Sequence, residues 1–236
     1  MTPRSWRLLI FDWDGTLLDS VGSIVSCVRA TLAELGEAPA AEESIRASIG
    51  LGLRETVDMF RPGCDDELLD QVVAVYRRLW REEFSLRPAL FSGVGEVLKT
   101  FREDGFVLAI ATAKSRSGLR ADLSRTGLSD VFSSTRTMDE APSKPHPRMV
   151  FDILAELDVS AEESLIIGDT THDLAMAENA GVTAVAVCSG CESRQVLQRL
   201  HPAGCLDSVI DLPRWLEGEL PDRLRPGTRQ VSRPSG

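Results

Sequence analysis

The chain has 236 residues and a net charge of −10, with 26 lysine and arginine residues against 36 aspartate and glutamate residues. Such a chain lacks the clustered basic charge of a nucleic-acid-binding surface, and its hydrophobic content of 43% is ordinary for a globular protein. No apolar run is long enough to cross a bilayer, and Met1–Arg7 does not resemble a secretory signal. We therefore expect a cytoplasmic protein that binds neither nucleic acid nor membrane.

The first predicted element is a buried strand over Leu8–Phe11, which runs directly into an Asp-Trp-Asp-Gly-Thr motif. Because side chains alternate along an extended segment, Asp12 and Asp14 should point to one side and Trp13 to the other. Two carboxylates placed in this way suit a nucleophile and a proton shuttle. We assign nucleophilic attack to Asp12 and general acid–base catalysis to Asp14.

The end of the same motif supports a phosphate site better than a calcium loop. A calcium loop would need an acidic or amide residue in place of Thr16 and an acidic residue in place of Ser23, and neither is present. Gly15 permits a tight turn and Thr16 offers a hydroxyl. We expect both residues to contribute to substrate binding.

The next part of the chain, Val21 to Phe84, has apolar residues at helical spacing, with breaks at Pro39 and at Pro62-Gly63. It predicts a group of helices inserted after the first strand. Within it, a Gly-Leu-Gly-Leu segment forms a flexible loop that leads to Arg54. Arg54 either binds a carboxylate or sugar oxygen of the substrate or is a solvated residue at a helix start, and the sequence leaves both interpretations open.

Two further apolar runs, Phe106–Ile110 and Leu165–Ile167, predict more buried parallel strands. The polar motifs that follow them are Thr112-Ala113-Lys114 and Gly168-Asp169-Thr170-Thr171-His172-Asp173. In an open α/β sheet, ligands bind beyond the carboxyl ends of the strands. The motifs after all three strands should therefore meet in one crevice.

The acidic residues of that crevice indicate a metal site. Asp169 and Asp173 are four residues apart at a predicted helix start, so they should share one face of its first turn. Together with Asp12 and Asp14 they crowd four carboxylates together, and such a cluster calls for a cation with oxygen ligands. We expect Mg²⁺. Lys144, one of only three lysines in the chain, adds a fixed positive charge between nucleophile and phosphate.

With these motifs the chain resembles the haloacid dehalogenase superfamily, in the subgroup that contains phosphoglycolate phosphatases and β-phosphoglucomutases. The Asp-x-Asp-Gly-Thr and Gly-Asp-Thr-x-x-Asp motifs carry the resemblance, which covers nearly the whole chain except its last segment. The resemblance implies that Asp12 is the nucleophile and Asp14 the general acid and base. It also implies that Thr112 and Lys144 are phosphate ligands.

The same resemblance implies a metal-ligand set. Mg²⁺ would be bound by Asp12, the backbone carbonyl of Asp14 and Asp169, and Asp173 would support the site without contacting the ion. True dehalogenases of this superfamily lack the second carboxylate, because a leaving halide needs no proton. The presence of Asp14 therefore favours phosphoester chemistry.

The expected fold is α/β, with a doubly wound, Rossmann-like and mostly parallel sheet as its core and an inserted helical cap. We expect the core to comprise residues 1–18 and 88–218 and the cap residues 19–87. Residues 219–236 are rich in arginine, proline and glycine, and this composition predicts a disordered tail.

The expected activity is Mg²⁺-dependent hydrolysis of a small phosphorylated metabolite through an aspartyl-phosphate, with 2-phosphoglycolate as the first substrate to consider. Ala113 lies in the predicted substrate-binding segment, where phosphoglycolate phosphatases often carry an asparagine that could touch the phosphate. Alternatives are a β-phosphoglucomutase-like mutase, a nucleotide or pyrophosphate phosphatase and, outside enzymes, a phospho-acceptor signalling domain. We expect a monomer or a homodimer.

The five cysteines allow one competing site. Cys188 and Cys191, with His201 and Cys205 downstream, could form a zinc site, and the first two could form a redox pair. Their spacing is not a standard ligand pattern. We favour the interpretation that Cys188 and Cys205 are small hydrophobic residues at strand ends and that Cys191 lies in a loop.

Overall fold

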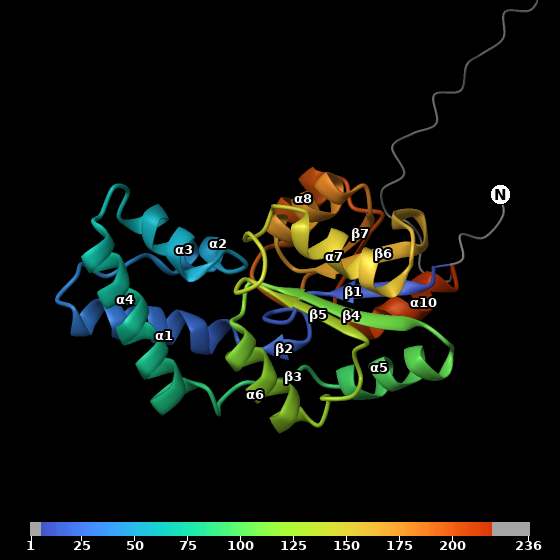
Figure 1. Ribbon diagram of the computed structural model, residues 1–236, viewed down its shortest axis with the longest axis horizontal. Coiled ribbons are helices and arrows are strands. Elements are labelled where there is room, and N and C mark those ends of the chain that lie inside the picture. The colour runs from blue at the N-terminus through green and yellow to red at the C-terminus, as the bar shows by residue number, and fades with distance from the viewer. Residues whose placement is uncertain (1–5, 219–236) are drawn as a thin grey trace, which may run out of the picture.

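The computed structural model describes residues 6–218, and its centre is a six-stranded sheet with the order β5-β4-β1-β6-β7-β8 (Figure 1). The strands are β1 (Leu8–Phe11), β4 (Val107–Thr112), β5 (Ser134–Thr137), β6 (Ser164–Gly168), β7 (Thr183–Val187) and β8 (Gly204–Leu206). Every neighbouring pair is parallel. The chain adds β4 and β5 on one side of β1 and then returns to add β6, β7 and β8 on the other. This reversal beside β1 confirms the doubly wound α/β core.

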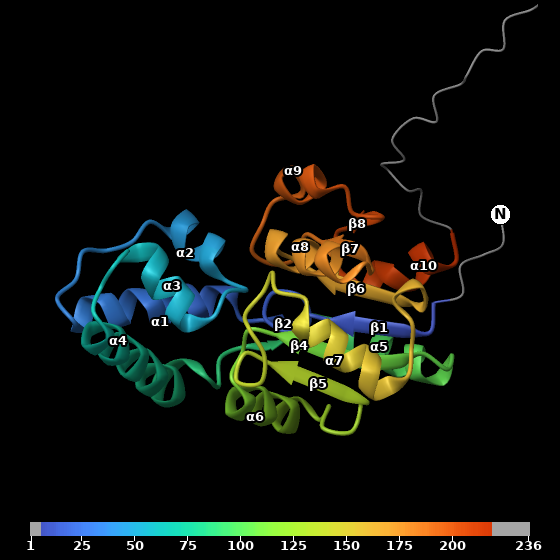
Figure 2. The ribbon, with the colours of Figure 1, turned by 45° about the horizontal axis from the view of Figure 1, so that its top comes forward.

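Both faces of the sheet are covered by helices (Figure 2). On one face, Leu9 and Phe11 of β1 pack with helices α5, α6 and α10, and on the other Leu8 and Ile10 pack with α7 and α8. The bounds are α5 (Val94–Glu103), α6 (Arg116–Thr126), α7 (Arg148–Leu157), α8 (Thr171–Ala180) and α10 (Leu212–Leu216). Burial on both faces explains why the strands are continuous apolar runs in the sequence.

A second group of helices, which we call the helical insert, lies beyond the carboxyl ends of the strands (Figures 1 and 2). It comprises α1 (Val21–Glu34), α2 (Glu42–Ser48), α3 (Leu53–Phe60), α4 (Asp66–Leu79) and the π-helix η1 (Trp80–Phe84). The chain enters and leaves the insert through two short antiparallel strands, β2 (Leu18–Asp19) and β3 (Ala89–Leu90).

Short elements complete the described chain: η2 (Ala161–Glu163), α9 (Arg194–Leu197), η3 (Gln198–Leu200) and η4 (Val209–Asp211). The second predicted strand extends to Thr112, which pairs with Thr137 of β5 instead of following the strand. Within residues 6–218, no helix is long and apolar enough to span a membrane. The predicted tail at 219–236 lies outside the described residues.

Candidate active site

In the motif after β1, the side chains of Asp12, Trp13 and Asp14 each lie in a different environment. The backbone N–H of Asp12 donates to the carbonyl of Ile167 at 2.9 Å, which fixes Asp12 beside the end of β6. Trp13 is fully buried, and its Nε1 donates to Asp122 at 3.1 Å. Trp13 therefore points into the core, as the alternation predicts. The carboxylates of Asp12 and Asp14 face different partners.

Three buried carboxylates form a compact group. Asp12, Asp169 and Asp173 each place an oxygen within 4.8 Å of the other two. We predicted four carboxylates here, but the side chain of Asp14 is not part of the group. The predicted helix start was also wrong by two residues: Thr170 caps α8, so Asp169 lies in the loop before the helix and only Asp173 belongs to its first turn.

Lys144 lies against two of these carboxylates. Its Nζ is 2.7 Å from Asp12 Oδ1 and 2.7 Å from Asp173 Oδ1, and the residue is 1% exposed. Burial alone would lower the pKa of Lys144, but the two carboxylates raise it above its usual value. Lys144 therefore remains a cation.

One lysine does not balance the negative charge of the group. Burial raises the pKa of Asp12 to about 8, with Asp173 and Asp169 adding to the effect and Lys144 opposing it. Burial and the charge of Asp173 raise the pKa of Asp169 to about 6. A bound cation would reverse these shifts by stabilising the ionised carboxylates.

The residues present fit a hard divalent cation. Asp12 Oδ1 is buried, and its contact among residues 6–218 is the ion pair with Lys144 Nζ at 2.7 Å. A carboxylate oxygen can accept more than one contact, so this pair leaves a lone-pair direction for a cation. Carboxylate oxygens are the ligands that Mg²⁺ prefers. The donor set therefore agrees with the expected metal.

Two loops hold Asp169 in place. Thr16 Oγ1 donates to Asp169 Oδ1 at 2.8 Å, and the backbone N–H of Cys191 donates to Oδ2 at 2.7 Å. A Cβ atom at either Gly15 or Gly190 would overlap the Asp169 carboxylate, so this approach requires glycine at both positions. Gly15 also has a φ of +84°, which favours glycine.

These contacts give the motif's last two residues a structural role. Thr16 is fully buried with its hydroxyl on Asp169, and neither it nor Gly15 lines the cavity described below. Both residues position Asp169, and the substrate contact expected of them stays a prediction. Sequence reasoning missed Gly190, although the two flanking cysteines had drawn attention to the loop.

Asp14 belongs to a separate network. Ser20 Oγ donates to Asp14 at 2.6 Å, and Lys114 Nζ lies 3.0 and 3.2 Å from the two carboxylate oxygens. Lys114 Nζ also lies 3.2 Å from Asp122 and 4.9 Å from the centre of the Trp80 ring. Burial lowers the pKa of Lys114, but Asp14 and Asp122 more than offset this and raise it above its usual value. This lysine thus connects the motif after β1 to α6 and to the helical insert.

Asp122 is the second residue that sequence reasoning missed. It is 4% exposed and receives hydrogen bonds from Trp13 and Arg125 while also pairing with Lys114. No motif contains Asp122, since it lies in the middle of α6. A useful signal was its position as an acidic residue on the buried face of a helix, where an unpaired carboxylate would be unfavourable.

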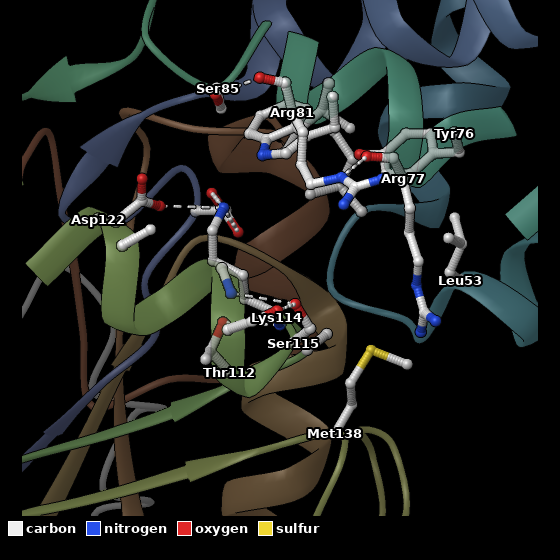
Figure 3. A pocket seen from close by; sticks show the side chains of 18 of the residues that line it. Leu53, Tyr76, Arg77, Arg81, Ser85, Thr112, Lys114, Ser115, Asp122 and Met138 are labelled. Carbon is white, nitrogen blue, oxygen red and sulfur yellow. Dashed lines mark hydrogen bonds and ion pairs between the residues drawn. The ribbon is translucent and has the colours of Figure 1, made fainter. Parts of the chain in front are cut away.

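A cavity of about 890 Å³ lies between the strand ends and the helical insert (Figure 3). Its core side includes Asp12, Asp14, Thr112 and Ala113, which the sequence predicted as site residues. The hydroxyl of Thr112 accepts the backbone N–H of Lys114 at 3.2 Å. Four of the predicted residues therefore share the wall of one cavity.

Arg54 is not among the lining residues. Its guanidinium pairs with Asp70 of α4, and the side chains are 55% and 64% exposed. Of the two interpretations that the sequence left open, the structure matches the solvated arginine at a helix start. The loop before it does reach the core: the N–H of Gly52 donates to Ser143 Oγ at 2.7 Å. Near the end of α2, the carbonyl oxygen of Ala47 lies 3.2 Å from His172 Nε2.

The cysteines do not form the zinc site that could be drawn from the sequence. Among residues 6–218, the aspartates described above are the only group of three or more candidate ligands close enough for a metal. The Sγ atoms of Cys188 and Cys205 are 3.5 Å apart as free thiols beside an apolar cluster, and Cys191 lies in a loop. This arrangement matches the interpretation that we favoured.

Comparisons with known proteins agree with this architecture. A family model for haloacid dehalogenase-like hydrolases matches residues 9–187. The probable phosphatase IndB of Dickeya dadantii is 35% identical over 209 residues, covering 87% of this chain and 91% of its own. A phosphoglycolate phosphatase of Pseudomonas syringae pv. syringae is 32% identical, covering 95% and 86% of the two chains.

Other similar proteins show that the substrate differs among relatives. The pyrophosphatase PpaX of Anoxybacillus flavithermus is 29% identical, covering 86% of this chain and 94% of its own. A solved structure from Bacteroides fragilis, described as a haloacid dehalogenase-like hydrolase, superposes with a TM-score of 0.83 at 25% identity. That alignment covers 88% of this chain and 99% of the other.

Proposed function

The chain belongs to the haloacid dehalogenase-like hydrolase family and is a phosphatase, and from this premise we propose that it hydrolyses a small phosphorylated metabolite through an aspartyl-phosphate on Asp12. The observation that carries the proposal is the position of Asp12. Its carboxylate is buried beside Lys144 and two further aspartates, and it forms part of the wall of a cavity large enough for a metabolite.

In the first step a carboxylate oxygen of Asp12 attacks phosphorus, and the bond from phosphorus to the ester oxygen breaks. Asp14, which lines the same cavity, donates a proton to the departing oxygen, so that the product leaves as an alcohol. Thr112 and Lys144 hold the phosphate oxygens and offset their charge.

In the second step water hydrolyses the acyl-phosphate. Asp14 now acts as a base and takes a proton from the water, whose oxygen bonds to phosphorus as the bond to Asp12 breaks. The products are inorganic phosphate and the regenerated Asp12 carboxylate. The helical insert excludes bulk water during both steps, so residues 19–87 act as a cap over the core formed by 1–18 and 88–218.

The metal in this proposal is Mg²⁺. Asp12, Asp169 and the backbone carbonyl of Asp14 would hold it, and Asp173 would fix Lys144 beside it. When bound, Mg²⁺ neutralises charge on the phosphate oxygens and on the nucleophile. Its support is the group of three buried carboxylates, whose negative charge a single lysine does not balance.

A panel of phosphorylated metabolites, assayed with Mg²⁺ and with EDTA, tests the proposal. The panel should contain 2-phosphoglycolate, sugar phosphates, nucleotides and pyrophosphate. We expect Mg²⁺-dependent release of inorganic phosphate, no turnover by Asp12→Asn, and a phosphoryl adduct on the peptide containing Asp12 in rapidly quenched wild-type enzyme. An Asp12→Asn variant that is folded and fully active would overturn the assignment. Interconversion of sugar phosphates without phosphate release would identify a mutase.

A further inference from the structure

The wall that the helical insert contributes to the cavity carries positive charge alone. The insert residues that line the cavity include only two charged side chains, Arg77 of α4 and Arg81 of η1. Neither guanidinium forms an ion pair with any of residues 6–218. The single hydrogen bond recorded for either runs from Arg81 Nε to the carbonyl of Arg77 at 3.2 Å.

The neighbouring arginine on the same helix shows the contrast. Arg78 lies one residue further along α4 and pairs with Glu34 and Glu82 outside the cavity. Arg78 therefore has carboxylate partners, whereas the two arginines that line the cavity have none among residues 6–218. Figure 3 shows Arg77 reaching from α4 toward Leu53 and Met138.

The other two cationic side chains that line the cavity already form ion pairs with carboxylates. Lys114 pairs with Asp14 and Asp122, and Arg125 pairs with Asp122. Among the lining residues, Arg77 and Arg81 are therefore the only cations available to a ligand. A guanidinium binds carboxylate or phosphate oxygens in a bidentate manner, and both arginines are exposed side chains that a ligand can reach.

The size of the cavity indicates how far apart the two ends of a bound ligand lie. A volume of about 890 Å³ is within the range of sites that enclose drug-sized ligands, far more than 2-phosphoglycolate fills. The nucleophile belongs to the core wall and the two arginines belong to the insert wall. A ligand that touches both walls needs a spacer between its two charged ends.

We propose that the substrate is a phosphomonoester whose far end carries a second anionic group, bound by Arg77 and Arg81 across the cavity from Asp12. The spacer is longer than the single methylene of 2-phosphoglycolate. The inference rests on the phosphatase proposal above and adds the chemical class of the substrate to it. The second anion is a carboxylate or a phosphate, since both present the oxygens that a guanidinium binds.

Three series of probes test this inference. They are ω-phosphorylated carboxylic acids of two to six carbons, the α,ω-bisphosphates, and the monophosphates of the diols of equal length, which lack the second anion. We expect kcat/KM to be higher for one or both anionic series than for the diol series, with an optimum above two carbons. The series with the larger preference identifies the second anion.

Arginine variants locate the contact. Arg77→Met and Arg81→Met should each reduce the anion-to-diol ratio of kcat/KM by about tenfold, equivalent to about 1.4 kcal/mol. Arg77→Lys should keep part of the preference. Arg78→Met is the matched control, because it removes a guanidinium of the same helix outside the cavity, and it should leave the ratio unchanged.

The outcomes separate this inference from the broader proposal. Equal kcat/KM for anionic and diol probes of every length, or a preference that survives in both methionine variants, overturns the inference and leaves the phosphatase intact. An optimum at two carbons overturns the proposed spacer. The wild-type comparison stands even if a variant fails to fold. If the enzyme hydrolyses no phosphomonoester with Mg²⁺ present, the proposed function itself fails.

Discussion

Lys114 is the residue that joins the proposed general acid to the rest of the molecule. It contacts both carboxylate oxygens of Asp14, the buried Asp122 of α6, and the face of Trp80 in the helical insert. Without it, the Asp14 carboxylate would keep, among residues 6–218, only the hydrogen bond from Ser20. We therefore expect Lys114 to act through Asp14, by holding its carboxylate toward the cavity and away from Asp12, Asp169 and Asp173.

Replacement of Lys114 by methionine should damage the proton-transfer step selectively. We expect kcat/KM for an alkyl phosphate to fall by about 10²-fold, within the range for loss of acid catalysis, and kcat/KM for 4-nitrophenyl phosphate to fall much less. A nitrophenolate leaves without help from an acid, whereas an alkoxide needs the proton. Steady-state kinetics on the two esters measures the difference.

Asp14→Asn provides the reference for this experiment. It should show the same dependence on the leaving group, and the double variant should be little worse than Asp14→Asn alone, because both changes affect one function. Equal losses on the two esters would show that Lys114 serves general stability instead.

At the residue scale, sequence reasoning could identify candidate residues only where the signal is local in the chain. Asp12, Asp14, Thr112, Lys144 and Asp169 were predicted because each belongs to a short motif in or directly after a strand or loop. Asp122 and Gly190 were missed because their roles appear only when α6 and the loop after β7 fold against the first motif. The sequence left the role of Arg54 open for the same reason, since its partner Asp70 comes from another helix.

At the scale of elements, the loop of residues 188–193 between β7 and α9 holds Asp169 in place, and we call this loop the clasp. Ser189 Oγ donates to the carbonyl of Gly15 at 3.1 Å, and Cys191 donates its N–H to Asp169. The loop thereby ties the turn after β1 to the turn after β6. The contacts of this loop were not visible in the sequence, because they depend on the position of β7 next to β6.

A methyl group in this clasp should weaken metal binding. Gly190→Ala introduces a Cβ that overlaps the Asp169 carboxylate, so either the loop or the carboxylate must move. We expect the Mg²⁺ concentration for half-maximal activity to rise by about 10- to 100-fold, as for other changes that disturb the support of a ligand. Calorimetric titration with Mg²⁺ checks the affinity directly.

Gly22→Ala is the control for this substitution. Gly22 lies in α1 with nothing within 4 Å of the added methyl group, so its Mg²⁺ dependence should match wild type. An unchanged metal affinity in Gly190→Ala would show that the Asp169 position tolerates the displacement, and the clasp would then have no role in metal binding.

For the whole molecule, the buried acidic centre links stability to pH and to Mg²⁺. The pKa of Asp12 in the metal-free fold, about 8, lies above its ordinary value of 3.8, so the folded state binds more protons than the unfolded chain between these values. The free energy of unfolding should therefore decrease as the pH rises from about 5 to 8. The raised pKa of Asp169 acts in the same direction.

Bound Mg²⁺ should restore the free energy of unfolding that the metal-free protein loses as the pH rises. Fewer protons must be displaced at pH 8 than at pH 5, so binding becomes tighter as the pH rises. At a concentration 100 times the Kd the metal adds about 2.7 kcal/mol to the stability. Calorimetric melting curves with EDTA and with Mg²⁺ across this range test the prediction. A metal-free melting temperature that does not fall with pH, or an equal effect of Mg²⁺ at both ends, would contradict it.

The sequence predicted much of the architecture at this scale. Three apolar runs followed by motifs were enough to indicate a parallel sheet with one reactive edge, because an apolar run and the motif after it are both short, local patterns in the sequence. The sheet order and the contacts of the insert depend on long-range packing and needed the structure. Cytoplasmic location and oligomeric state stay predictions.

The ribbon of β2 and β3 has a consequence for how such proteins diversify. Leu18 pairs with Leu90 and Asp19 with Ala89, so the two ends of the intervening segment are one strand spacing apart, about 5 Å. A module of any length whose own termini are adjacent can be exchanged at this junction without moving the strands. Grafting a foreign module between these positions would replace the cavity wall that carries Arg77 and Arg81 and the Trp80 ring beside Lys114, while Asp12, Asp169 and Asp173 stay in the core.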